Sequence, residues 1–200
     1  MIKVVVLDLD GVYFLNSHEN FKKNLGKQFS LTEKQIVAVY FKSQKMQEYK
    51  KGKTTGDQFW SWAIKEWGIN ATKDEILEIL ASSYEINPEA QNLIKKLNAH
   101  GIKLALCSNN FPERIKAVDE KLDFLKNFDI QVFSYEEGAT KPSREIFNTL
   151  IKKSQVAPSE IVYFDDSAEA ISTAKQLGIN AFLYTSFDEM VTQINRLINK

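Results

Sequence analysis

The chain has 200 residues, formally zero net charge and one cysteine, Cys107. This length suits one domain, or a modest domain with an insertion, and it can bury a sizeable core without disulfides or metals. Zero net charge gives no reason to expect nucleic acid or a membrane surface as a partner. A lone cysteine excludes an intramolecular disulfide and favours a reducing compartment, so we expect a soluble cytoplasmic protein.

The first predicted element is a buried strand over residues 2–8, with the sequence IKVVVLD. Its apolar residues are continuous, which is typical of a parallel strand covered on both faces. The run is too short to span a membrane, and no small-residue cleavage site follows it. The predicted strand ends at one carboxylate, Asp8, and a second carboxylate, Asp10, and the turn residue Gly11 follow it.

The segment from residue 15 to residue 85 shows helical patterns and no convincing strand. Thr32 followed by Gln35 is typical of a capping box. One helical face gathers apolar side chains that we expect to be buried, whereas Trp62 faces elsewhere and should be more exposed. That face carries Trp60, Ala63, Ile64 and Trp67. The predicted helices cover residues 18–29, 31–51, 55–68 and 72–84.

Strand and helix patterns alternate along the rest of the chain, which predicts an α/β domain with a parallel sheet and right-handed crossovers. The predicted strands cover residues 101–108, 130–136, 160–166 and 179–185. The predicted helices cover residues 87–101, 112–128, 141–154 and 167–178. We therefore predict a Rossmann-like core domain from residues 1–14 and 86–200, with a small helical cap domain, residues 15–85, inserted after the first strand.

Polar residues follow the strands at the ends where ligands bind in open α/β sheets. Asp8 and Asp10 follow the first strand, Ser108-Asn109-Asn110 the second, and Asp165-Asp166 the strand IVYF, while Lys141-Pro142 opens the next helical pattern after residues 130–136. Four carboxylates in one site repel one another, so a pKa must rise or a cation must bind.

These residue types suit phosphoryl transfer. Oxygen ligands with room for water and a phosphate suit Mg²⁺, and a lysine supplies a point positive charge for a phosphate oxygen. A serine hydroxyl and backbone N–H groups near the start of a helix can hold the other oxygens. The set predicts phosphoryl chemistry with a carboxylate nucleophile.

The four motifs resemble those of the haloacid dehalogenase-like (HAD) hydrolases, in order and in strand context. They are Asp8-Leu9-Asp10-Gly11-Val12, Ser108, Lys141 and Asp165-Asp166. The resemblance covers nearly the whole chain, because the helical insertion lies where the family carries a cap. The stretches KPSREIF and VYFDDSAEAISTAKQLGINAFLY look most like the small phosphatase branch that includes the bacterial α-glucose-1-phosphate phosphatases.

The resemblance implies a role for each matching residue. Asp8 would attack phosphorus and carry an aspartyl-phosphate, and Asp10 would protonate the leaving oxygen and then deprotonate the attacking water. Ser108 would hydrogen-bond the transferring phosphate, with Asn109 beside it as a further substrate-binding residue. Lys141 would bridge the phosphate and Asp8.

The resemblance also implies a Mg²⁺ site. Asp166, the Asp8 side chain and the main-chain carbonyl of Asp10 would hold the ion, with Asp165 as a supporting or alternative ligand. Many members of the family carry a further acid four residues after the metal aspartate, where this chain has Ala170. The division of roles between Asp165 and Asp166 therefore stays open.

We therefore predict a Mg²⁺-dependent phosphatase of a small phosphorylated metabolite, a sugar phosphate being one candidate. A phosphomutase shares all four motifs, and a haloacid dehalogenase uses an aspartate nucleophile but needs no metal and has no use for so many acids. A catalytically silent binding module would have lost the nucleophile or the lysine. Specificity should come from the cap, with candidates in residues 13–16 and at Phe41, Lys45 and Tyr49, and a less favoured substrate contact at His18. The sequence predicts neither the substrate nor the oligomeric state.

Overall fold

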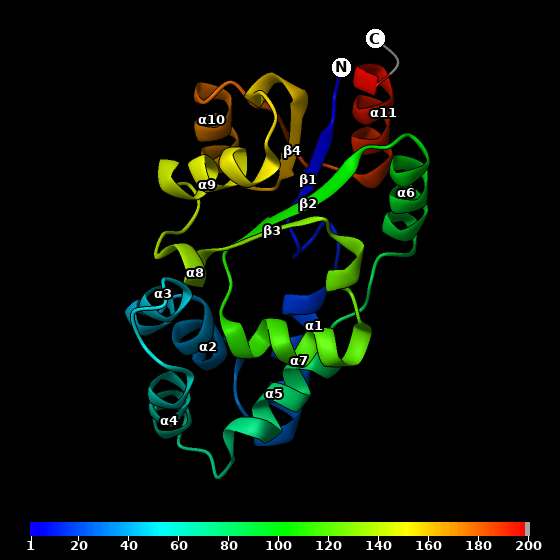
Figure 1. Ribbon diagram of the computed structural model, residues 1–200. Helices are drawn as coiled ribbons and strands as arrows, with labels where there is room; N and C mark the ends of the chain where they lie inside the picture. The colour runs from blue at the N-terminus through cyan, green and yellow to red at the C-terminus, as the bar shows by residue number, and fades with distance from the viewer. Residues whose placement is uncertain (199–200) are drawn as a thin grey trace.

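The computed structural model describes residues 1–198 and is built around a five-stranded parallel sheet (Figure 1). The strands are β1 (Val4–Leu7), β2 (Lys103–Ser108), β3 (Ile130–Phe133), β4 (Ile161–Asp165) and β5 (Asn180–Leu183). Their spatial order is β3-β2-β1-β4-β5, with Val6 of the central strand opposite Ala105 of β2 and Tyr163 of β4. The predicted Rossmann-like α/β class is confirmed, and the carboxyl ends of β2, β1 and β4 lie side by side.

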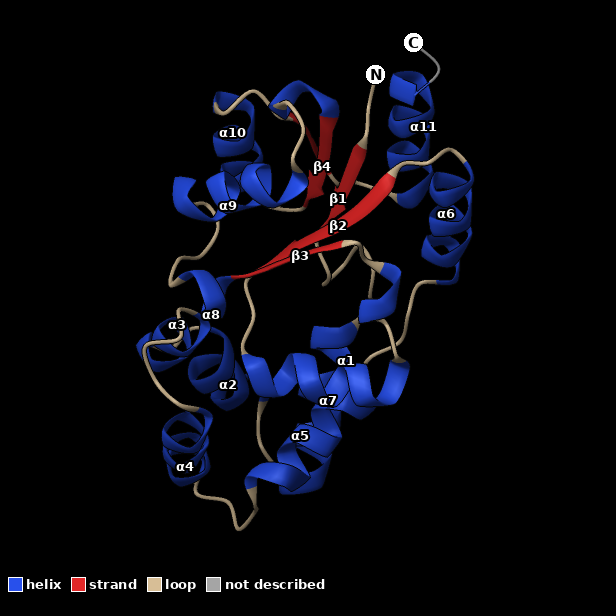
Figure 2. Ribbon diagram, viewed as in Figure 1, coloured by secondary structure: helices blue, strands red, loops and turns tan. Residues whose placement is uncertain are grey.

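Helices cover both faces of the sheet, which explains why its strands are continuously apolar (Figure 2). On one face, Val4 and Val6 belong to a buried cluster with Phe147. That face is covered by α9 (Arg144–Ser154) and α10 (Ala168–Gln176). The opposite face is covered by α6 (Pro88–Ala99) and α11 (Phe187–Ile198).

Six further helices lie beyond the carboxyl edge of the sheet, in the lower half of Figure 1. They are α1 (Ser17–Phe29), α2 (Glu33–Ile36), α3 (Gln44–Lys50), α4 (Gly56–Trp67), α5 (Lys73–Ser82) and α7 (Pro112–Leu122), and a π-helical turn, Val37–Phe41, joins α2 to α3. Residues 15–85 contain no strand, as the sequence predicts, and the capping box at Thr32 is present. The division of the chain into two domains stays a prediction.

An aromatic stack joins these helices to the segment that follows β2. Phe111 lies directly before α7, and its ring stacks on Tyr49 of α3 with centroids 4.5 Å apart. Tyr49 in turn stacks on Phe59 of α4 with centroids 4.9 Å apart. One hydrophobic cluster therefore runs from the sheet into the helical segment.

Several predicted boundaries differ from the structure for local reasons. The predicted helix 31–51 is divided, because Ser43 starts α3 afresh by accepting a hydrogen bond from the Met46 N–H. The predicted strand 130–136 ends at Phe133, where α8 (Ser134–Glu137) begins. The predicted helix 112–128 ends at Leu122, since Asp123 takes a positive φ of 46°, and a 3₁₀ turn, Leu125–Asn127, follows.

Two further sequence expectations change in detail. Lys141 lies in a turn and not at the head of a helix, because α9 begins only at Arg144. Ile64 is half-buried, although it shares the predicted face with Trp60, Ala63 and Trp67, which are buried. Trp62 is more exposed than Trp60 and Trp67, as predicted, and the Lys45 ammonium lies 5.5 Å from the centre of its ring. Among residues 1–198, no helix is long and apolar enough to cross a membrane.

Candidate active site

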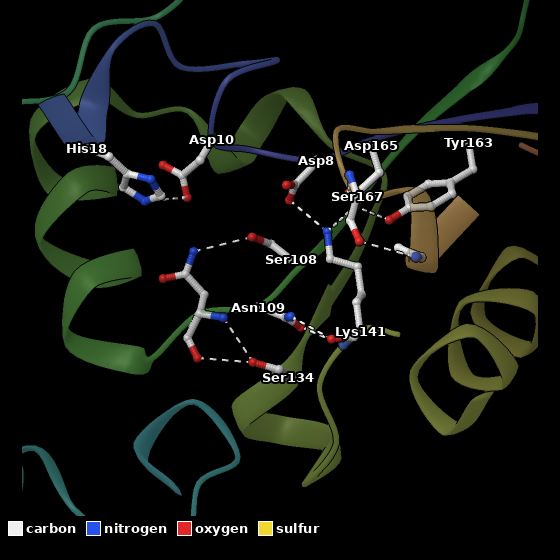
Figure 3. A network of polar contacts seen from close by, with 12 residues as sticks. Asp8, Asp10, His18, Ser108, Asn109, Ser134, Lys141, Tyr163, Asp165 and Ser167 are labelled. Carbon is white, nitrogen blue, oxygen red and sulfur yellow. Dashed lines mark hydrogen bonds and ion pairs between the residues drawn. The ribbon is translucent and has the colours of Figure 1, made fainter. Parts of the chain in front are cut away.

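A cavity of about 340 Å³ opens at the carboxyl edge of the sheet, and all seven residues that the sequence predicts for the site line it. The strand order explains why they meet. Ser108 is the last residue of β2, Asp165 is the last residue of β4, and Asp8 directly follows β1 between them. Figure 3 shows Asp8, Asp165 and Lys141 converging on one side of this cavity, with Asp10 beside His18 on the other.

Lys141 joins two of the acids. Its Nζ lies 2.9 Å from Asp8 Oδ1 and also pairs with Asp165 Oδ2, and the ammonium side chain is only 5% exposed. Burial alone would lower the pKa of Lys141, but the charges of Asp8 and Asp165 outweigh it and raise that pKa. Lys141 is therefore a permanent cation that holds the Asp8 carboxylate in place.

Asn109 fixes the backbone of Lys141. The Lys141 N–H donates to Asn109 Oδ1 at 2.7 Å, and Asn109 Nδ2 donates back to the Lys141 carbonyl at 3.0 Å. This pairing uses both ends of the amide. The substrate contact predicted for Asn109 stays a prediction. Its hydrogen bonds to the backbone of Lys141 are a structural role that the sequence did not indicate.

Asp8 lies in an environment that opposes its charge. Burial is the largest influence and raises the pKa of Asp8 to about 6, with Asp165 and Asp10 adding to the rise and Lys141 opposing it. The carboxylate is still mostly ionised at neutral pH, so it can act as a nucleophile without a base to deprotonate it.

Asp165 and Asp166 differ sharply in accessibility. Asp165 is 1% exposed and accepts hydrogen bonds from the Tyr163 hydroxyl, the Lys141 ammonium and, at 2.7 Å, the Ser167 N–H. Asp166 is exposed, and its pKa is raised by burial of part of the side chain and by the charge of Asp165. The oxygens of Asp166 therefore remain accessible to a cation, whereas those of Asp165 are held by protein donors.

The donor set fits a hard divalent cation. One carboxylate oxygen from each of Asp8, Asp165 and Asp166 lies within 4.8 Å of the others. Oxygen ligands of this kind are those that Mg²⁺ takes in proteins. Lys141 offsets only part of their negative charge, so the cluster remains attractive to a cation.

Asp10 has a different set of partners. Its Oδ1 accepts from the Ser17 hydroxyl at 2.7 Å and from the Tyr84 hydroxyl at 3.4 Å. Its Oδ2 pairs with the Arg114 guanidinium and lies 3.5 Å from His18 Nε2. Burial would raise the pKa of Asp10, but Arg114 and His18 together hold that pKa well below its usual range.

Sequence reasoning missed Arg114, although a signal was present. Its side chain is 2% exposed and rests against the Tyr84 ring, with the guanidinium carbon 4.9 Å from the ring centre. Arg114 lies four residues before Val118 and beside Ile115, so it falls on the buried face of α7. A charged residue on an apolar helical face indicates a buried partner.

The specificity candidates of the helical segment fall in other places. Tyr49 is buried and donates its hydroxyl hydrogen bond to Glu113, and Lys45 lies against Trp62. The cavity wall instead includes His18 and Lys50, together with Asn16 from the specificity candidates in residues 13–16. No sequence pattern distinguishes Lys50, because this residue is one of several neighbouring lysines.

Comparisons with known proteins agree with this geometry. A family model described as haloacid dehalogenase-like hydrolase matches residues 2–178. A phosphorylated carbohydrates phosphatase of Thermotoga maritima is 30% identical over 108 residues, which are 53% of this chain and 49% of that protein. A D-ribitol-5-phosphate phosphatase of Bacteroides thetaiotaomicron is 38% identical over 76 residues, which are 38% of this chain and 34% of that protein.

The fold has solved counterparts. The crystal structure of a HAD family enzyme from Bacteroides thetaiotaomicron, in complex with magnesium and inorganic phosphate, superposes with a TM-score of 0.79 at 22% identity. The superposition covers 95% of this chain and 99% of that one. At this level of identity the likeness concerns the fold.

Proposed function

Because the chain belongs to the haloacid dehalogenase-like hydrolases, we propose that it is a phosphatase that cleaves small phosphate monoesters through an aspartyl-phosphate on Asp8. The observation that carries the proposal is the Asp8 carboxylate itself, which lines the cavity with its Oδ1 held 2.9 Å from Lys141 Nζ. The two phosphatases that are similar to parts of the chain support it.

In the first half of the reaction, an oxygen of Asp8 attacks phosphorus and the bond from phosphorus to the leaving oxygen breaks. Asp10 gives its proton to that oxygen, so the product leaves as an alcohol. Arg114 opposes protonation of Asp10 in the free protein, and the negative charge of an arriving phosphate raises the pKa of Asp10 in the complex. Ser108 donates its hydroxyl to the transferring phosphoryl group.

In the second half, Asp10 is ionised and takes a proton from a water that attacks the phosphorus of the aspartyl-phosphate. The bond between phosphorus and the Asp8 oxygen breaks, and inorganic phosphate leaves. Arg114 and His18 favour this ionised form of Asp10. Lys141 keeps the Asp8 carboxylate oriented through both halves.

Mg²⁺ would be held by Asp8 and Asp166, with the Asp10 carbonyl as a further ligand and Asp165 supporting the cluster. When bound, the ion would offset the negative charge of the phosphoryl oxygens. The protein supplies the rest of the recognition, and the two similar phosphatases favour a substrate related to a phosphorylated carbohydrate.

The test is phosphate release from a panel of small phosphate monoesters, with Mg²⁺ and with EDTA, for the wild type and Asp8→Asn. We expect release that requires the metal and falls by at least about a thousandfold in Asp8→Asn, because the amide cannot attack phosphorus. Asp188→Asn, an exposed change on α11, is the matched control and should leave release unchanged.

Two results would contradict the proposal. Full activity of Asp8→Asn would exclude Asp8 as the nucleophile. Undiminished release in EDTA would exclude the Mg²⁺ requirement and favour metal-independent chemistry on the same fold.

A further inference from the structure

Lys50, the last residue of α3, lines the cavity and differs from the other cations of the site. Lys141 pairs with two acids and Arg114 pairs with Asp10. Lys50 is half-buried, and within residues 1–198 its ammonium has no acidic partner. A partly desolvated ammonium without a counter-ion is unfavourable, so an anion that enters the cavity gains a ready partner.

The backbone of Lys50 is fixed to the segment that follows Ser108. The Ser134 hydroxyl, which is fully buried, donates to the Lys50 carbonyl at 2.6 Å and accepts from the Asn110 N–H at 2.9 Å. One hydroxyl therefore links the backbone of Lys50 to the segment that follows β2. This arrangement presets the position of the lysine before any substrate arrives.

The next turn of the chain is fixed as well. Gly52 has a φ of +65°, and a Cβ at this position would lie 2.5 Å from the Tyr135 carbonyl oxygen. The chain after α3 therefore packs closely against the start of α8, where Ser134 and Tyr135 lie. Lys50 projects from a backbone held at two points, unlike an ordinary surface lysine.

Lys50 comes from α3, in the helical segment beyond the carboxyl edge of the sheet, whereas Asp8 and Ser108 lie at the strand ends (Figure 1). In the proposed reaction the transferring phosphoryl group lies against Asp8 and Ser108, so the leaving group extends away from the sheet toward these helices. Lys50 lines the cavity on that side. Burial lowers the pKa of Lys50 to about 8, with smaller influences from the charges of Arg114 and Asp10.

We propose that Lys50 binds a carboxylate carried by the leaving group, so that the preferred substrates are phosphate monoesters of small hydroxy acids, sugar acids included. The assignment rests on the proposed phosphatase function, which defines the leaving-group side. A single carboxylate matches the single charge of Lys50. The cavity volume of about 340 Å³ is at the lower end of the range for ligand sites and suits a short leaving group.

The test uses substrate pairs that differ only in the carboxylate. 3-Phosphoglycerate is compared with glycerol 3-phosphate, and 2-phosphoglycerate with glycerol 2-phosphate, all with Mg²⁺. We expect the wild type to show a kcat/KM roughly tenfold or more higher for each acid, the discrimination that a charge-assisted contact supplies. In Lys50→Met this preference should fall to about twofold or less, mainly through a higher KM for the acids.

Matched variants separate this role from a structural one. Lys53→Met removes an exposed lysine three residues further along and should leave the preference unchanged. Lys50→Arg keeps the charge and should keep most of the preference. Ser134→Ala keeps the Lys50 side chain but removes the hydrogen bond that holds the Lys50 carbonyl. It should weaken the preference for the acids without abolishing it.

The outcomes distinguish this inference from the proposed function. Equal kcat/KM values for the phosphoglycerates and the glycerol phosphates in the wild type would overturn the role of Lys50, and so would an equal loss for both in Lys50→Met. Either result would leave the proposed phosphatase function intact. A lack of phosphate release from every ester, 4-nitrophenyl phosphate included, would overturn the proposed function and this inference with it.

Discussion

Asp8 and Asp10 are two residues apart, yet their carboxylates lie in opposite environments. Burial and two neighbouring acids raise the pKa of Asp8, whereas Arg114 and His18 hold the pKa of Asp10 down despite its burial. The sequence predicts that both acids reach the site. It does not predict this difference, because Arg114 lies 104 positions away from Asp10 and the contact depends on how α7 packs.

The raised pKa of Asp8 predicts that its charge destabilises the metal-free fold. Its pKa in the fold is about 6, above the ordinary value near 3.9, so the penalty is present above about pH 6 and disappears as the pH falls toward about 4. In EDTA at pH 7.5, Asp8→Asn should raise the free energy of unfolding by about 1–3 kcal/mol. Urea denaturation at several pH values measures this, and a less stable Asp8→Asn at pH 7.5 would contradict it.

The Asp10–Arg114 pair predicts strong coupling between the two residues. Arg114→Met leaves the Asp10 carboxylate, which is 17% exposed, without its guanidinium partner. Loss of one partner of a fully buried pair costs about 3–5 kcal/mol, and we expect a smaller cost at this partly exposed site. In the Asp10→Asn background the same change should cost much less, because no charge is left unpaired. Arg144→Met, whose guanidinium contacts Gln176 at the exposed start of α9, is the control and should change the stability by less than about 0.5 kcal/mol. Equal costs in both backgrounds would exclude the coupling.

At the scale of elements, local sequence signals predict strands and caps well and predict breaks poorly. The apolar run before Asp8 and the capping box at Thr32 depend on residues near in sequence, and both are confirmed. The early end of the strand at Phe133 depends on Ser134, whose hydroxyl bridges to Lys50 and Asn110 far along the chain. Contacts between residues so far apart produce no periodic pattern in the sequence, so the end of this strand could not be predicted from it.

The turn after α3 offers a prediction about one close approach. Gly52→Ala adds a Cβ that meets the Tyr135 carbonyl oxygen, so the turn must shift and Lys50 with it. Gly138→Ala is the matched control, since Gly138 has a φ of +67° but an added Cβ would meet no atom within 4 Å. We expect Gly52→Ala to lose at least about 1 kcal/mol more stability than Gly138→Ala, as measured by urea denaturation. Equal losses would show that only backbone conformation matters at Gly52.

At the scale of the whole molecule, the helices beyond the sheet share a core with it. The stack from Phe59 through Tyr49 to Phe111 crosses from α3 and α4 to the start of α7, and a single hydrophobic cluster contains all three rings. This continuity does not follow from the alternation of strands and helices in the sequence. It implies that residues 15–85 unfold together with the sheet.

Tryptophan fluorescence tests that implication directly, because Trp60, Trp62 and Trp67 all lie in α4. Far-UV circular dichroism reports the helices of the whole chain. We expect the two signals to give the same midpoint in urea, as a two-state transition requires. A fluorescence midpoint at lower urea than that of circular dichroism would show that the helical segment unfolds first.

The central place of β1 has a consequence for how the protein is made. Ribosomes synthesise β1 first, but its two neighbours, β2 and β4, are completed only at Ser108 and Asp165. Until Asp165 emerges, one edge of β1 lacks its partner strand, and an unpaired strand edge invites pairing with other chains. Asp8, the proposed nucleophile, therefore follows a strand with an unpaired edge until β4 is complete, and β1 depends on rapid completion of β4, or on a chaperone that covers its edge.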